Sequence, residues 1–300
     1  MTVPLLLLAA GRSTRFGALK QVAPVGPGGA SILTYTVVDA LLAGFEEVVV
    51  VVRPEIEATI REHLDRHLGA GLPIRIVHQR AALGTAHAAL VGLDGIDGPS
   101  AIANGDDAYG RDALTRLWQS ASTTSSAVGE PVWCALVAYP ILDTLSDHGG
   151  VSRGWVQTEG DAVTAIDEIY DVREEGGHGP LRGRSVSGED VALPRDALGS
   201  MNLWVLGPGI QALLAREFDR QTASGEFLLS SVLDRLRAGG EVTVRLAGRA
   251  HGWFGLTFAA DLPAATARIA EAHRAGHYTQ PLAAQVDPFR ADTVGSPGSR

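Results

Sequence analysis

Apolar residues in the first part of this chain gather in short runs, which alternate with longer stretches whose apolar positions recur at helical spacing. Short apolar runs of this kind predict buried β-strands, and the longer periodic stretches predict helices packed on one face. The predicted strands are residues 4–10, 47–52, 74–78 and 101–104. The predicted helices are residues 32–43, 55–68, 85–93 and 111–121.

This alternation of strand and helix determines the expected fold class, which is α/β. Each strand, helix and strand in succession favours a right-handed crossover, so the chain predicts a mostly parallel sheet covered by helices on both faces. Ligands bind such sheets at the carboxyl ends of the strands. The loops after residues 10, 78 and 104 are therefore expected on one rim, where their side chains can form one site.

The pattern becomes more mixed after residue 121. A polar, serine-rich connector at 122–130 precedes predicted strands at 133–139, 154–158, 162–169, 201–206 and 242–246 and predicted helices at 209–219, 226–238 and 261–275. Residues 170–199 are rich in glycine, arginine and acids, which predicts a long loop or a mobile hairpin. The last residues, 283–300, have the composition of a disordered tail.

Composition excludes several classes of function. The formal net charge of the 300 residues is −9, so the chain is not expected to bind nucleic acid or an anionic membrane over a broad surface. Any phosphate ligand must then be bound locally. The single cysteine, Cys134, cannot form an internal disulfide and lies in an apolar strand, which favours a buried structural role. No export or membrane signal is apparent, and a cytoplasmic location is expected.

The loop after the first predicted strand contains the only lysine of the chain. It reads Ala10-Gly11-x-Ser13-x-Arg15, with Lys20 close behind, among 25 lysine and arginine residues in total. Backbone N–H groups of such a loop can bind phosphates, Arg15 can contact two oxygens at once, and Lys20 can act as a point charge. A solvated loop with coincidental cations is the alternative interpretation of the loop by itself.

A second feature follows the predicted strand at 74–78 and opens a helix. Gln79 offers both a donor and an acceptor, as the edge of a pyrimidine base requires, and Gly84 would let the backbone approach the ring. Alternatively, Gly84 and Thr85 mark only a helix start with Thr85 as its cap. His87 is assigned to the helix face as a structural residue.

Two carboxylates follow the predicted strand at 101–104. Asp106 and Asp107 come directly after Gly105, and hard oxygen ligands at a strand end suit a Mg²⁺ ion that binds nucleotide phosphates. Asp106 is the expected metal ligand, with Asp107 beside it. The alternative is a turn-forming pair of aspartates before the helix that starts at residue 111.

Taken together, these three features resemble the sugar-1-phosphate nucleotidyltransferases, also called NDP-sugar pyrophosphorylases, over residues 4–280. The resemblance implies a Rossmann-like three-layer α/β/α fold with a mixed, mostly parallel sheet, formed by a single domain of residues 1–282. Residues 1–121 would be the nucleotide-binding half and 122–282 the acceptor-binding half. It also implies nucleotide contacts at Ala10, Gly11, Ser13, Gln79, Gly84 and Thr85, a metal at Asp106, and acceptor contacts at Gly150, Glu168 and Asn202.

The activity implied by the resemblance is Mg²⁺-dependent transfer of a nucleotidyl group from an NTP to a sugar-1-phosphate, with release of pyrophosphate. Arg15 and the backbone of residues 11–14 would bind the β- and γ-phosphates, and Lys20 would bind the α-phosphate and the incoming phosphate. The segment around Gln79 favours UTP or dTTP over purine nucleotides. No protein nucleophile is needed, so catalysis would consist of positioning and charge neutralisation.

Two positions depart from the family pattern. Ser13 stands where the loop usually has a second glycine, and Gly255 stands where many members have a second metal-binding Asp or Asn. Water and substrate phosphates can complete a Mg²⁺ shell, so we expect activity despite Gly255.

Other functions remain open at this stage. The acceptor could be a cyclitol phosphate, an alditol phosphate or a phosphonate, or the chain could be a regulatory subunit that binds nucleotide sugars without making them. A dinucleotide-dependent oxidoreductase is disfavoured because the first loop lacks Gly-x-Gly-x-x-Gly. A homo-oligomer is also left open.

Overall fold

One large sheet runs through the part of the chain described by the computed structural model, which comprises residues 2–11, 16–124, 129–146, 148–177, 179–220 and 227–290. Its strands are β1 Pro4–Leu8, β2 Glu47–Val52, β3 Ile74–His78, β4 Ser100–Asn104, β6 Val132–Pro140, β7 Val151–Glu159, β8 Ala162–Glu174, β9 Leu181–Arg184, β10 Asp190–Leu193, β11 Leu198–Leu206 and β12 Val242–Arg249. A separate small sheet pairs β5 Asp107–Ala108 with β13 Phe254–Gly255. The helices are α1 Ile32–Ala43, α2 Glu57–Leu68, α3 Thr85–Gly92, α4 Arg111–Thr123, α5 Ile210–Arg220, α6 Leu229–Ala238, α7 Leu262–Arg274 and α8 Ala283–Val286.

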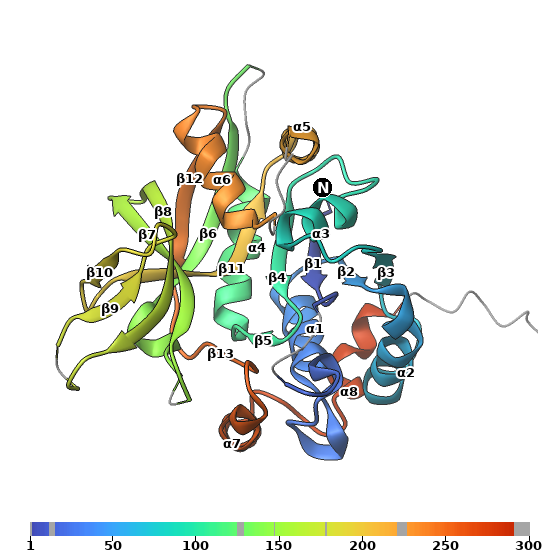
Figure 1. The fold of residues 1–300 in the computed structure, drawn as a ribbon. Coiled ribbons are helices and arrows are strands. Elements are labelled where there is room, and N and C mark those ends of the chain that lie inside the picture. Colours follow the sequence, from blue (N-terminus) through green and yellow to red (C-terminus); the bar gives the residue numbers. More distant parts are fainter. Residues whose placement is uncertain are drawn as a thin grey trace, which may run out of the picture.

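The sheet is mixed, as expected, and its two kinds of pairing separate along its length. The strand order is β10-β9-β8-β12-β6-β11-β4-β1-β2-β3, with β7 against both β8 and β11. Parallel ladders join β4, β1, β2 and β3, and a further parallel ladder joins β12 to β6. The other ladders of this sheet are antiparallel. The expectation of a mostly parallel sheet therefore holds only for the N-terminal half, because the strands of the other half pair mainly in antiparallel ladders (Figure 1).

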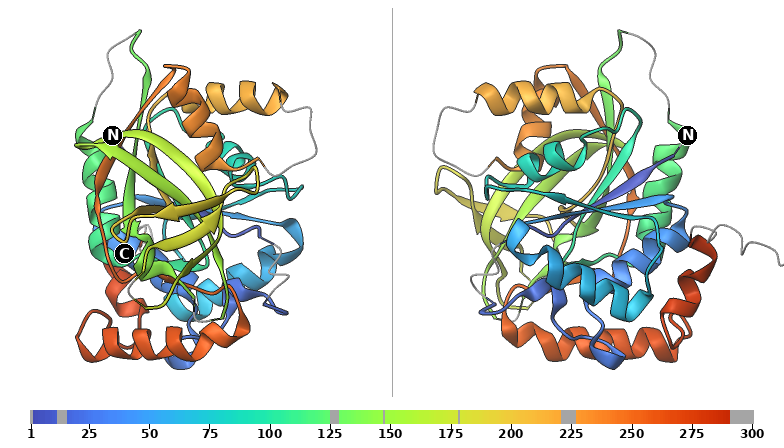
Figure 2. Two further views of the ribbon diagram at one scale, coloured as in Figure 1. Left: turned by 60° about the vertical axis from the view of Figure 1, so that its left-hand side comes forward. Right: turned by 90° about the vertical axis from the view of Figure 1, so that its right-hand side faces the viewer.

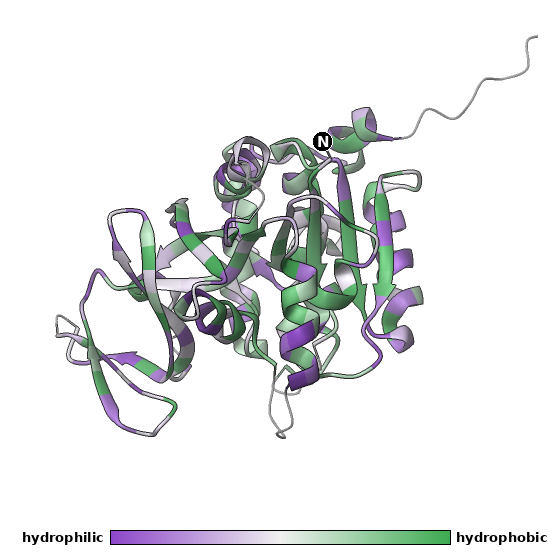
Figure 3. Ribbon diagram, turned by 90° about the horizontal axis from the view of Figure 1, so that it is seen from above, coloured by the Kyte–Doolittle hydropathy of each residue, from purple (hydrophilic) through white to green (hydrophobic). Residues whose placement is uncertain are grey.

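Alternate residues of β1 point to two hydrophobic cores, one on each face of the sheet. Leu5 and Leu7 belong to the core that α1, α2, α4, α7 and α8 help to form, whereas Leu6 and Leu8 belong to the core formed with α3, α5 and α6. Leu5, Leu6 and Leu7 are fully buried. A strand covered on both faces can be apolar at every position, which explains the uninterrupted leucine run. Figure 2 shows helices on both faces of the sheet, and Figure 3 shows that the strands of the N-terminal half are mostly apolar.

Local signals set the ends of the elements. The Ser31 hydroxyl accepts a hydrogen bond from the Thr34 backbone N–H and starts α1, and Gly44 ends that helix in the left-handed region at φ +112°. The predicted bounds of most strands and helices differ from the observed ones by a few residues. The helix predicted from residue 55 begins at Glu57, because the preceding residues, Pro54–Ile56, form a 3-10 turn.

Two predictions about the second half were wrong in part. The described residues of 170–199, expected as a long loop or a mobile hairpin, continue β8 and then form β9, β10 and the start of β11. β9 and β10 do pair as an antiparallel hairpin, so only the long loop is contradicted. These strands bury a small apolar core that includes Ile169, Val172, Leu181 and Leu193. That core is made by contacts between separate strands, so local composition did not indicate it.

The second wrong prediction concerns the C-terminus. Residues 283–290, expected in a disordered tail, include α8 and a 3-10 turn, and Val286 is fully buried there. Residues 291–300 lie outside the described residues. Within the described chain, none of the helices has both the length and the apolar character to cross a membrane.

A buried histidine joins α1 to α2 and makes stability depend on pH. His63 is 7% exposed, and its Nε2 lies 3.0 Å from the Thr34 hydroxyl. Burial lowers the pKa of His63 to about 4, and the charges of His67 and Arg66 add to the shift. The unfolded chain therefore takes up this proton at a higher pH than the folded chain does.

We expect the stability that neutral His63 contributes to be present above pH 6.5 and to be lost as the pH falls from about 6.5 towards about 4. Urea unfolding at pH 7 and at pH 5 measures this loss. Between the two, the free energy of unfolding of wild type should fall by about 1 to 2 kcal/mol more than that of His63→Gln. Equal losses in the two proteins would contradict this assignment.

Candidate functional site

The first loop leaves the carboxyl end of β1 in the middle of the sheet. Gln21 is buried, and its Nε2 donates to the Ala9 carbonyl at 3.1 Å and to the Gly11 carbonyl at 3.2 Å, which ties the following 3-10 turn to the strand end. A Cβ added at Gly11 would meet nothing within 4 Å. The predicted phosphate contacts Ser13 and Arg15 lie in residues 12–15, outside the described residues, so their roles stay predictions.

Lys20 and Asp106, predicted from separate motifs, form an ion pair. The pair joins the turn after β1 to the segment after β4, and both side chains are about four-fifths buried. Lys20 Nζ also lies 3.4 Å from the Leu256 carbonyl, and the Leu256 N–H lies 3.4 Å from the Asp106 carbonyl. The carboxyl ends of β1 and β4 therefore meet at one rim, as the parallel pairing of these strands requires.

A hydrogen-bonded network lies directly beneath this pair. Asn104 Nδ2 donates to Asp107 Oδ2 at 2.8 Å, and Asn104 Oδ1 accepts from Asn202 Nδ2 at 2.8 Å. The Tyr109 hydroxyl accepts from the Asn104 N–H at 3.0 Å and donates to the Met201 carbonyl at 2.8 Å. The network connects β4, β5 and β11 and makes the position of the two carboxylates rigid.

The two carboxylates have different environments. Asp107 is 8% exposed, whereas the Asp106 side chain is 19% exposed. Burial raises the pKa of Asp107 to about 7, the neighbouring Asp106 charge adds to the shift, and the Asn104 hydrogen bond, Lys20 and Arg153 oppose it. Asp106 is thus the accessible carboxylate and Asp107 the structural one.

The segment predicted to recognise the base makes its contacts with other residues of the protein. Gln79 is 4% exposed, and its Nε2 lies 3.1 Å from the Gly84 carbonyl and 3.0 Å from His87 Nδ1. Gly84 has φ +103°, and a Cβ there would lie 2.4 Å from the Phe227 carbonyl oxygen. Glycine is therefore required by the close approach of Phe227, and base recognition by Gln79 and Gly84 stays a prediction.

Thr85 does not cap α3 with its side chain. The N-cap residue is Gly84, which has no side chain, and the Thr85 hydroxyl accepts a hydrogen bond from the Leu229 N–H at 2.9 Å instead. This contact joins the start of α3 directly to the start of α6, and Thr85 also lines a cavity. The alternative interpretation of Thr85 as a helix cap is wrong.

An open cavity of about 260 Å³ lies between the two halves of the sheet. Its lining brings together residues predicted for the nucleotide, the metal and the acceptor: Thr85, Asp106, Glu168 and Asn202. Other lining residues include Asn104, Asp107, Arg153, Gly154, Ser200, Met201, Leu228, Ser230, Trp253 and Thr257. Residues predicted from three separate parts of the sequence therefore meet at one cavity.

The acceptor residues are placed by antiparallel strands. Glu168 of β8 stands opposite Gly154 of β7, and burial raises the pKa of Glu168 while Arg153 opposes the shift. Asn202 has φ +60° where the pairing of β11 with β6 changes register, and this bulge directs its amide to Asn104. Gly150 lies beside Asp171 and is not part of the cavity lining, so its acceptor contact stays a prediction.

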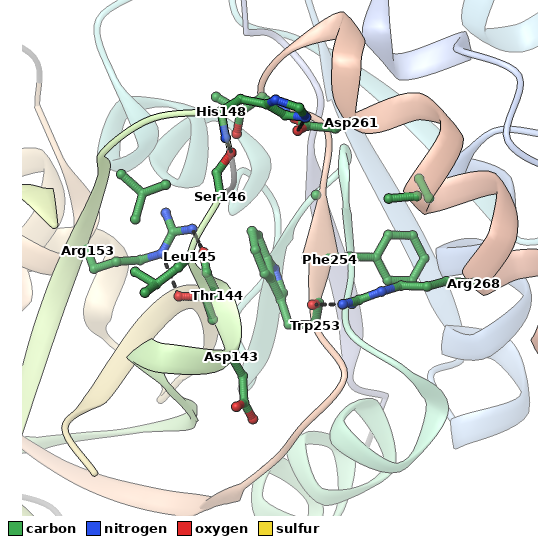
Figure 4. A pocket seen from close by; sticks show the side chains of 15 residues that line it. Asp143, Thr144, Leu145, Ser146, His148, Arg153, Trp253, Phe254, Asp261 and Arg268 are labelled. Atoms are coloured by element: carbon green, nitrogen blue, oxygen red, sulfur yellow. Dashed lines mark hydrogen bonds and ion pairs between the residues drawn. The ribbon is translucent and has the colours of Figure 1, made fainter. Parts of the chain in front are cut away.

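Arg153 and Trp253 were not predicted as site residues. Both line the cavity described above and a second cavity of about 150 Å³ beside it, shown in Figure 4. The Arg153 guanidinium lies over the Trp253 ring, 5.0 Å from its centroid. An arginine followed by a glycine in a strand is too common to signal a site, and strand pairing alone shows what Arg153 faces.

The residues present fit a Mg²⁺ site in which the protein supplies only one or two of the ligands. Asp106 supplies an accessible carboxylate at the strand end, and within the described residues no three His, Cys, Asp or Glu side chains gather to bind a metal. Mg²⁺ commonly keeps one or two carboxylates and takes its other ligands from water and substrate phosphates. The donor set therefore matches a metal that arrives with a nucleotide.

The comparisons with known proteins agree with this geometry. A family model described as MobA-like NTP transferase domain matches residues 5–160, just over half of the chain. The chain is 31% identical over 154 residues to a UTP–glucose-1-phosphate uridylyltransferase, AglF, of Haloferax volcanii. That match covers 49% of this chain and 62% of the relative. The expected resemblance to sugar-1-phosphate nucleotidyltransferases is confirmed.

Two solved structures share the fold. An inositol-1-phosphate CTP transferase from T. maritima superposes with a TM-score of 0.58 at 15% identity, covering 90% of this chain and 97% of that one. A putative glucose-1-phosphate thymidylyltransferase from Bacillus anthracis in complex with a sucrose superposes with a TM-score of 0.60 at 12% identity. It covers 90% of this chain and 95% of that one. The expected nucleotidyltransferase fold is thereby confirmed.

Gly255 provides a test of how the site is packed. It pairs with Asp107 between β13 and β5, and a Cβ at residue 255 would lie 2.2 Å from Asp107 Oδ1 and 2.9 Å from the Trp253 ring. We expect Gly255→Ala and Gly255→Asp to be destabilised alike, by about 1 to 3 kcal/mol in chemical unfolding, because either side chain displaces the Asp107 carboxylate. If Gly255→Asp were as stable as wild type and bound Mg²⁺ more tightly than Gly255→Ala, this packing constraint would be refuted.

Proposed function

The chain belongs to the MobA-like NTP transferase domain family, and we propose that it transfers a nucleotidyl group from an NTP to a sugar-1-phosphate, with Mg²⁺ and release of pyrophosphate. The observation that supports this most directly is the pairing of Lys20 with Asp106 at the rim of a cavity that Glu168 and Asn202 also line. One cation, one accessible carboxylate and polar acceptor contacts are the groups that joining two phosphorylated substrates requires.

In the proposed reaction a phosphate oxygen of the acceptor attacks the α-phosphorus of the NTP. A phosphorus–oxygen bond forms to that oxygen, and the bond from the α-phosphorus to the departing pyrophosphate breaks. Lys20 would neutralise charge on the α-phosphate and on the attacking phosphate. Asp106 would bind Mg²⁺, which when present supplies further neutralisation of the phosphate oxygens.

The protein residues act by positioning rather than by covalent catalysis. Cys134 is fully buried in β6, and burial raises its pKa to about 12, so it is unsuited to act as a nucleophile. Two polyanions must instead be brought together in line, for which rigid placement is the main requirement. The hydrogen-bonded network of Asn104, Tyr109 and Asn202 supplies that rigidity at the metal end.

Two features favour UTP as the nucleotide, with dTTP next. The segment around Gln79 matches the family's pattern for a uracil or thymine base, and the name of the Haloferax relative specifies UTP and glucose 1-phosphate. The chain spans 62% of that relative's length, so the use of these two substrates by this chain is part of the proposal. Use of an NTP also agrees with the expected cytoplasmic location.

The experiment that tests the function is pyrophosphate release with Mg²⁺, across the common NTPs and a panel of sugar-1-phosphates and cyclitol phosphates. We expect release with UTP or dTTP and one sugar-1-phosphate, and loss of at least about 100-fold in kcat for Asp106→Asn. Release only with a cyclitol phosphate would reassign the acceptor. Tight binding of a nucleotide sugar without turnover for any pair would favour a regulatory subunit instead.

Lys20 provides a second test. Lys20→Ala should lower kcat by about 100-fold or more while changing the Kd for the NTP by less than about fivefold, because its charge is needed most in the transition state. Kd is measured by calorimetry with the NTP alone. Lys20→Arg, which keeps the charge in a bulkier group, should lose less. Equal losses in kcat and NTP affinity for Lys20→Ala would contradict a transition-state role.

A further inference from the structure

Arg153 occupies an unusual position for a charged residue. It lies on β7, half-buried, where the two cavities meet, and both cavities are lined by Arg153, Trp253 and Thr257. Figure 4 shows its side chain beside Thr144 and the Trp253 ring. An arginine with this placement can contact a ligand in either cavity.

The contacts of Arg153 fix the guanidinium without pairing its charge. Nε donates to the Thr144 hydroxyl at 2.8 Å, Nη2 to the Thr144 carbonyl, and Nη1 to the Ser152 carbonyl at 2.8 Å. All three partners are neutral oxygens. Since a guanidinium has five N–H donors, one N–H on each terminal nitrogen remains for a ligand.

The charge of Arg153 lacks a direct partner among the described residues. No carboxylate of the described residues hydrogen-bonds to it, and Asp107 and Glu168 act on it only at longer range. Burial lowers the pKa of Arg153 to about 10, against the influence of those two carboxylates. A desolvated cation without a counterion costs free energy, and residues kept in this state are often poised for an anionic ligand.

Trp253 packs against the flat face of the Arg153 guanidinium. Its ring lies under the guanidinium, and the Trp253 carbonyl accepts a hydrogen bond from Arg268 at 2.9 Å. A planar guanidinium stacked on an aromatic ring is held in one orientation, with its edge free to bind two oxygens of one phosphate. Asp106 lines the same larger cavity as Arg153, and Lys20 is paired with Asp106.

We propose that Arg153, stacked on Trp253, forms an anion subsite at the junction of the two cavities, which binds the phosphate monoester of the acceptor. The inference rests on the proposed function for the identity of that phosphate. The NTP phosphates are the other possible source, and the neighbouring Gly154, Glu168 and Asn202 of the acceptor half favour the acceptor. Arg153 thereby determines specificity, because it selects acceptors with a charged phosphate over neutral sugars.

The test uses inorganic phosphate as the probe, titrated into the full-length protein at constant ionic strength and followed by tryptophan fluorescence and calorimetry. Trp253→Phe identifies the part of the signal that comes from the subsite. We expect saturable phosphate binding that Arg153→Gln weakens about tenfold or more. Arg268→Gln is the matched control, because Arg268 also donates to a carbonyl and stacks on a ring, that of Phe254, but lines only the smaller cavity.

Several results would overturn the proposal: no saturable phosphate binding by either method, wild-type binding in Arg153→Gln, or an equal loss in Arg268→Gln. Arg153→Lys covers the case in which the Gln variant does not fold, and it should retain phosphate binding about three- to tenfold weaker than wild type. Loss of UTP affinity with unchanged phosphate binding would assign Arg153 to the nucleotide and refute the acceptor subsite.

The titration requires no NTP and no turnover, so it reports on Arg153 even if no substrate pair releases pyrophosphate. With an active pair, Arg153→Gln should raise KM for the acceptor by about tenfold and leave KM for the NTP within about twofold. An unchanged acceptor KM would refute the subsite and leave the proposed function intact.

Discussion

The hydrogen bonds of Asn104 are the interaction on which the rest of the site depends. This side chain ends β4 and contacts Asp107 on one side and Asn202 on the other, while its backbone N–H contacts the Tyr109 hydroxyl. Asp107 and Tyr109 follow Asn104 within a few residues, whereas Asn202 comes from a distant strand, β11. Because each polar group inside the network is satisfied, the strand end is rigid, and Asp106 is presented at one position beside Lys20.

The C-terminal segment completes this arrangement. Phe254 and Gly255 pair with the residues after Asp106, and the Leu256 backbone lies against both Lys20 and Asp106. The missing side chain at Gly255 leaves room for the Asp107 carboxylate. A departure from the family pattern that suggested a lost metal ligand is therefore also a packing requirement, since a residue with a side chain at 255 would overlap Asp107.

The two halves of the sheet place different parts of the site. Parallel strands in the N-terminal half bring loops to one rim, and antiparallel strands in the C-terminal half place Arg153, Gly154 and Glu168 across from it. The strands β9 and β10 extend this antiparallel part and bury its apolar side, so they support the strands that face the cavity. Gly84 likewise serves the structure, by allowing Phe227 to approach α3.

The sequence by itself determined the α/β alternation and the convergence of the loops after β1 and β4, which carry Lys20 and Asp106. The alternation is local, because the hydrophobic period can be seen in consecutive residues, and the convergence follows from it, because parallel strands end at one rim. Only the tertiary structure decided that residues 170–199 form strands, that Gln79 is buried against Gly84, and that Arg153 lies between two cavities with no counterion among the described residues. Each of these depends on which distant strand lies alongside, and no periodicity within a single segment specifies its neighbour.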